Sequence, residues 1–145
     1  MEIYTIGFTK KSAAQFFGLL KQHEIRRLLD VRLNNVSQLA GFAKRNDLAY
    51  FLRELVGAEY RHEPLLAPTQ VMLDDLKKRR GSWADYAERF LALMHERQIE
   101  HELDPAIFEE RTVLLCSEPT PERCHRRLIL EYLNASWGDV RAIHL

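Results

Sequence analysis

Short apolar segments alternate along this chain with amphipathic helical patterns, and this alternation constrains the fold more than any other feature. Apolar and β-branched runs predict strands, which fall at residues 2–6, 27–31, 59–62, 112–116 and 140–143. Apolar residues at helical spacing predict helices after Ser12, from Asn46 or Asp47 to Gly57, over about Thr69–Lys78, over Trp83–Arg97 and over Glu122–Asn134. We therefore expect an α/β fold with three layers, in which helices flank a largely parallel sheet.

The size of the chain fits one domain. Its 145 residues are 46% hydrophobic, and no linker-like tract divides them, so we expect a single α/β domain over residues 1–145. Acidic and basic residues balance at 21 each, so net charge alone does not indicate a nucleic acid or an anionic membrane as partner.

The sequence also suggests a cellular setting. The N-terminal residues lack the cationic start and apolar run of a signal peptide, and no apolar stretch reaches the roughly 18 residues of a bilayer span. We expect a cytoplasmic protein without a membrane partner. With only two cysteines, separated by seven residues, a disulfide framework is not expected and both thiols should be reduced.

Three loops follow predicted strands and contain most of the reactive side chains. They cover Gly7–Lys10, Arg32–Lys44 and Ser117–Pro121. In parallel sheets the ligand crevice lies beyond the carboxyl ends of the strands, so we expect these loops to form one site.

The junction after the strand at 112–116 is the richest segment. Thr120 is the predicted N-cap and Pro121 fits the first helical position, which would direct the helix dipole and its open N–H groups at the loop. Cys124 and His125 would then lie in or just after the first turn, where the dipole favours a thiolate. Full positive charges would come from the nearby Arg123, Arg126 and Arg127.

These patterns define two sets of candidate residues. The predicted catalytic residues are Cys116, Glu118, Cys124 and His125, with a cysteine as nucleophile or polar stabiliser and Glu118 with His125 as the proton-transfer pair. The predicted substrate-binding residues are Gly7, Thr9, Arg32, Ser37 and Arg126.

Each of these residues also has a structural interpretation, which the sequence leaves open. Cys116 can be an inert core cysteine, and Cys124 can be the first inward-facing residue of its helix. Asp30 and Arg32 share one side of their strand and can form a purely structural ion pair.

Three stretches together resemble a bacterial and archaeal family, the domain of unknown function 488 proteins. They are Tyr4–Thr9, Leu29–Arg32 with the downstream Ser37 and Phe42, and Leu114–Glu118 with Cys124–Arg126. The resemblance spans essentially the whole chain and implies a compact α/β domain whose polar residues converge on one site. Two positions depart from the pattern: Phe8 stands where many such sequences have histidine, and Asn35 where they often have proline.

A metal site is not expected from the spacing of ligands. Structural zinc sites use a short Cys-x-x-Cys knuckle and four ligands, neither of which is present. A three-ligand site of Cys116, Cys124 and His125 with an open position is the remaining alternative, but Cys124 and His125 would project about 100° apart if both were helical. We rank it well below a site without metal. We find no phosphate-loop, dinucleotide or zincin motif and expect no cofactor.

The first functional hypothesis is an enzyme that acts on a small anionic or phosphate-bearing substrate, such as a nucleotide or a nucleic-acid end. The second is a non-catalytic module that binds or senses a nucleotide or nucleic acid at the same place. The third is a thiol-based protein that responds to redox state through Cys116 and Cys124.

Overall fold

A computed structural model describes residues 1–34, 41–78, 81–118 and 121–145 of the protein. The strands are β1 Glu2–Gly7, β2 Arg27–Asp30, β3 Glu59–His62, β4 Thr112–Cys116 and β5 Arg141–His144. The α-helices are α1 Ala13–Gln22, α2 Arg45–Phe51, α3 Gln70–Lys77, α4 Trp83–Glu96, α5 Ile99–Glu102 and α6 His125–Trp137. A π-helical segment, Leu52–Val56, extends α2, and 3-10 turns cover Gly41–Ala43, Pro64–Leu66 and Pro105–Glu109.

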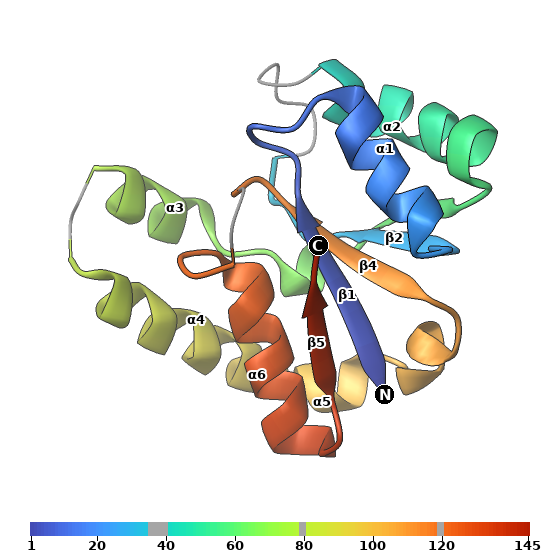
Figure 1. Ribbon diagram of the computed structural model, residues 1–145. Coiled ribbons are helices and arrows are strands. Elements are labelled where there is room, and N and C mark those ends of the chain that lie inside the picture. Colours follow the sequence, from blue (N-terminus) through green and yellow to red (C-terminus); the bar gives the residue numbers. More distant parts are fainter. Residues whose placement is uncertain (35–40, 79–80, 119–120) are drawn as a thin grey trace.

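The five strands form one sheet in the order β3-β2-β4-β1-β5, and every neighbouring pair is parallel. Helices α1 and α2 cover one face, and α4, α5 and α6 cover the other (Figure 1). The predicted three-layer α/β architecture is therefore confirmed. Helix α5 and the 3-10 turn after it were not predicted, because they are too short to produce a clear helical period.

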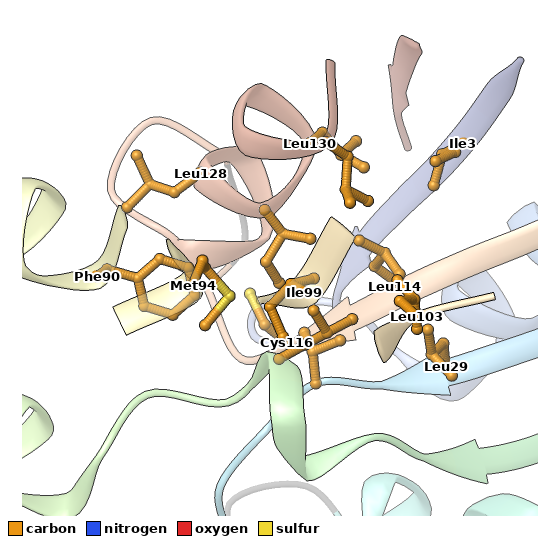
Figure 2. Close-up of a cluster of buried hydrophobic side chains, with 14 of the residues drawn as sticks. Ile3, Leu29, Phe90, Met94, Ile99, Leu103, Leu114, Cys116, Leu128 and Leu130 are labelled. Carbon is orange, nitrogen blue, oxygen red and sulfur yellow. The ribbon is translucent and has the colours of Figure 1, made fainter. Parts of the chain in front are cut away.

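Successive residues of the central strands point to opposite faces and so build two separate cores. In β4, Leu114 and Cys116 belong to the core under α4, α5 and α6, whereas Val113 and Leu115 belong to the core under α1 and α2. Figure 2 shows Cys116 among the apolar side chains of the first of these cores. The last residue of β4 therefore lies directly beneath the helical layer that contains α6.

The carboxyl ends of the central strands lie side by side. Gly7 of β1 is in register with Cys116 of β4, and Asp30 of β2 is in register with Leu115. The amide of Thr9 donates to the carbonyl of Ser117 at 3.1 Å, which continues this alignment beyond the strands. The loops after β1, β2 and β4 thus begin at one edge of the sheet, as predicted.

The start of α6 corrects the sequence prediction. The helix begins at His125 and not at Glu122, because Cys124 has extended backbone angles (φ −134°, ψ 139°) and is the N-cap. Pro121 lies in a turn before the helix, where its carbonyl accepts from the amide of Cys124 at 3.3 Å, and Thr120 lies outside the described residues. This later start places Cys124 outside the helical turn.

Among the described residues, no helix combines the length and the apolar character needed to cross a bilayer.

Candidate functional site

A disulfide joins the end of β4 to the start of α6. Cys116 is the last residue of β4, Cys124 is the N-cap of α6, and their sulfur atoms are bonded. Both side chains are buried, at 1% and 3% exposure. The sequence predicts two reduced thiols, and the structure corrects this. The extended backbone at Cys124 turns its side chain toward the strand end, a direction that a helical residue would not have.

Arg126 lies next to this disulfide, and its side chain is fully buried. Its Nη1 atom donates to the backbone carbonyl of Glu118 at 2.8 Å and approaches Sγ of Cys116 at 3.9 Å. Burial lowers the pKa of Arg126 to about 10, although the carboxylates of Glu118 and Glu122 oppose that shift. The guanidinium remains charged at neutral pH and holds the backbone at Glu118 close to Sγ of Cys116.

His125 is held in place by the backbone of Val31, the residue that follows β2. Its Nε2 atom lies 2.8 Å from the carbonyl oxygen of Val31, and its ring packs against Phe90 with centroids 5.5 Å apart. A carbonyl oxygen can only accept, so Nε2 carries the proton and Nδ1 has a lone pair. Burial lowers the pKa of His125 to about 4; Arg126 also lowers it, while the Val31 hydrogen bond and Asp30 act in the opposite direction.

This pKa predicts how stability depends on pH. Between pH 6.5 and 4 the unfolded chain binds a proton on His125 that the folded protein does not, so the free energy of unfolding should fall as the pH is lowered through that range. Urea denaturation at pH 7 and pH 5 measures the loss. His125→Gln should lose less stability between the two pH values than the wild type. Equal pH dependence in His125→Gln and wild type would contradict the assignment.

A cleft of about 130 Å³ opens beside the disulfide. It is lined by Leu73, Leu76, Trp83, Tyr86, Cys116, Ser117, Glu118, Arg123, Cys124 and His125. All four predicted catalytic residues are therefore brought together at this cleft. Trp83 and Tyr86 were not predicted to belong to the site, and Arg123 was expected there only as a nearby positive charge. The two aromatic residues, stacked with centroids 5.0 Å apart, follow a pattern along α4 that is typical of core packing.

Arg32 is held by the protein itself. Its Nε and Nη2 atoms donate to the two carboxylate oxygens of Asp30 at 2.8 and 2.9 Å, and Nη2 also donates to the carbonyl of Ala43 at 2.7 Å. The guanidinium also lies over the ring of Phe8, 5.3 Å from its centroid. Arg32 is only 4% exposed. These contacts support the structural interpretation of the Asp30–Arg32 pair, and substrate binding by Arg32 stays a prediction.

Gly7 and Thr9 position the loop after β4. A Cβ atom on Gly7 would lie 1.5 Å from the carbonyl oxygen of Glu118, so only glycine allows the two segments to approach this closely. The carbonyl of Gly7 accepts from Nζ of Lys11 at 2.9 Å, and burial followed by the charge of Arg126 lowers the pKa of Lys11. Direct substrate contact by Gly7, Thr9 and Arg126 stays a prediction. Ser37, the remaining predicted binding residue, lies outside the described residues.

Cys116, Cys124 and His125 form the group in the described residues that can hold a metal ion. Their ligand atoms all lie within 4.8 Å of one another. The expected 100° divergence between Cys124 and His125 is absent because Cys124 is not helical. The divergence expected for two helical neighbours therefore does not count against a metal site here, whereas the absence of a Cys-x-x-Cys knuckle and, among the described residues, of a fourth ligand still distinguishes this group from a structural zinc site.

A family model described as "Domain of unknown function DUF488" matches residues 12–133 of the chain. No curated protein and no solved structure matches it.

Proposed function

The chain belongs to the DUF488 family, and we propose that it is a thiol–disulfide redox protein in which Cys116 and Cys124 cycle between disulfide and dithiol. The observation that carries the proposal is the bond between the two sulfur atoms at the wall of a cleft. A disulfide that served stability alone would not need a cleft beside it or a buried guanidinium directed at one of its sulfur atoms.

The surroundings of the two sulfur atoms suggest which of them an incoming thiol attacks and which one leaves. An incoming thiolate attacks Sγ of Cys124, the sulfur–sulfur bond breaks, and Cys116 leaves as a thiolate facing Nη1 of Arg126. A second external thiol releases Cys124 from the mixed disulfide. The net reaction converts one protein disulfide and two external thiols into one protein dithiol and one external disulfide. Because both cysteines are buried and the cleft is small, the reductant is a low-molecular-weight thiol.

A peroxide-class oxidant converts the dithiol back to the disulfide. The thiolate of Cys116 attacks one peroxide oxygen, the oxygen–oxygen bond breaks, and a sulfenic acid forms. The other oxygen leaves as hydroxide and becomes water by taking up the proton that the Cys116 thiol had released. The thiol of Cys124 then displaces the second oxygen as water. In total, two thiols and one hydrogen peroxide give one disulfide and two water molecules.

Arg126→Gln tests the role of the guanidinium. Without its charge-assisted contact, the leaving thiolate of Cys116 is less stable, and reduction of the disulfide by a small thiol should slow about tenfold or more. Intact mass measured over time, with alkylation of the thiols released, gives the rate. Arg127→Gln is the matched control, because Arg127 is the next residue of α6 and pairs with Glu131 at 3.2 Å.

The wild-type protein provides a second test that needs no variant. Its disulfide should be reduced by a small thiol in the absence of denaturant, and peroxide should restore it. If reduction required unfolding, which circular dichroism would register, the bond would be structural and the proposed function would be wrong.

An enzyme acting on a small anionic or nucleotide substrate is the second candidate. It is favoured by the exposed Arg123, a cationic side chain that lines the same cleft as Glu118 and His125. In that case Arg123 binds the anion, and Glu118 and His125 transfer protons. Turnover that survives with the disulfide intact would favour this candidate, whereas turnover that requires free thiols would favour redox chemistry.

A further inference from the structure

We propose that the dithiol form of the protein binds one zinc-class divalent ion through Cys116, Cys124 and His125. This inference rests on the proposed function only in requiring that the disulfide can be reduced. Two thiolates and one imidazole form the donor set that zinc and cobalt prefer. Binding displaces a proton from each thiol and gives two thiolate ligands. Sulfur atoms that are joined in a disulfide cannot be thiolates, so the bound ion and the disulfide exclude each other.

The backbone already brings these three donors together. Their ligand atoms lie within 4.8 Å of one another, and donors on one tetrahedral zinc lie roughly 4 Å apart or less. The Cα atoms of Cys116 and Cys124 are 7.4 Å apart, wider than the roughly 4.4–6.8 Å that disulfides usually span. Two thiolates that share an ion, and so move their sulfur atoms apart, fit this backbone spacing.

His125 has the hydrogen bond that metal-binding histidines commonly make. Its Nε2 atom donates to the carbonyl of Val31 at 2.8 Å, which orients the ring and leaves the Nδ1 lone pair for an ion. A backbone carbonyl in this role also makes the imidazole a better donor.

The groups around the cysteines complete the site. Arg126 approaches Sγ of Cys116 at 3.9 Å and can hydrogen-bond to a bound thiolate. The burial of both cysteines keeps water away from the metal–sulfur bonds.

A three-donor site leaves one coordination position for water or a ligand. Both cysteines and His125 line the cleft, together with the exposed side chains of Glu118 and Arg123. The open position therefore faces the cleft, which is the arrangement of catalytic rather than structural zinc sites. The chemistry expected there is activation of a bound water or polarisation of a small polar ligand.

The test is titration of reduced, full-length protein with Co²⁺ and with Zn²⁺. One equivalent of Co²⁺ should bind and produce thiolate charge-transfer absorption, and Zn²⁺ should displace it. Oxidised protein should produce no such absorption. Cys116→Ser and His125→Gln should each weaken binding by about 100-fold or more, because loss of a ligand costs at least as much as loss of a group that orients one. The exposed His101→Gln is the control and should bind like wild type.

A second measurement uses only the wild-type protein, so its result does not depend on whether the variants fold. In reduced wild-type protein, Zn²⁺ should protect both cysteines from alkylation, as read by intact mass. Equal metal binding by oxidised and reduced protein, or unprotected cysteines in the presence of Zn²⁺, would overturn the proposal. A disulfide that forms reversibly in a protein that binds no metal refutes the metal site alone. Metal binding by a protein whose cysteines do not re-form the disulfide refutes the redox function alone.

Discussion

Replacing Asp30 with asparagine should lower the free energy of unfolding by about 3–5 kcal/mol, the cost of breaking a buried ion pair from one side. Asp30 is completely buried and accepts hydrogen bonds from the amide, Nε and Nη2 atoms of Arg32 and from the hydroxyl of Tyr60. Asparagine removes the negative charge and turns one acceptor into a donor that faces another donor. The guanidinium of Arg32 then remains charged and buried without its counter-ion.

Urea denaturation measures this loss, and Glu59→Gln provides the matched control. Glu59 also pairs with an arginine, Arg27, from a strand of the same sheet, but its side chain is 57% exposed. Removal of an exposed partner should cost less than about 1 kcal/mol. If both variants lose the same small amount of stability, the Asp30–Arg32 pair does not stabilise the fold as a buried ion pair.

Replacing Gly7 with alanine should destabilise the protein by about 3 kcal/mol, the upper end of the usual cost of overpacking. The added methyl group would lie 1.5 Å from the carbonyl oxygen of Glu118 and 2.5 Å from Nη1 of Arg126. Because one contact is with backbone, the backbone of Glu118 must move away from β1. That movement breaks the 2.8 Å hydrogen bond between Arg126 and Glu118.

Gly18→Ala is the control for this substitution. Gly18 is an exposed residue inside α1, and no atom would meet its Cβ within 4 Å. Alanine there should raise the free energy of unfolding by about 0.5–1 kcal/mol through its higher helix propensity. Gly7→Ala should also change the rate at which a small thiol reduces the disulfide, whereas Gly18→Ala should not. A Gly7→Ala protein with wild-type stability and reduction rate would refute the close-approach argument.

Much of the fold could be predicted because its elements have strong local patterns. The strand at Glu59–His62 and the helix that begins after Ser12 were both expected, and Ser12 caps that helix through the amide of Gln15. The predicted helix end at Gly57 agrees with the left-handed conformation of that residue, at φ +75°. Errors fell where local signals were weak, as in α5, or misleading, as at Pro121.

The site was harder to predict than the fold. Register places Gly7, Asp30 and Cys116 at one sheet edge, as the alternation of strands and helices implied. The side chains at that edge have several roles that local pattern cannot distinguish. Arg32 suits an anion or Asp30 equally well by residue type, and only its hydrogen bonds to Asp30 and Ala43 and its position over the Phe8 ring favour the second.

By itself the sequence determined the parallel α/β architecture and located the reactive residues near the carboxyl ends of the strands, because hydrophobic period and chain direction are local properties. Only the tertiary structure decided what these residues contact. The extended backbone of Cys124 brings its sulfur atom to Cys116, and the carbonyl of Val31 fixes the ring of His125. Those contacts join residues up to 94 positions apart in the chain, so they depend on packing between layers, which no local pattern encodes.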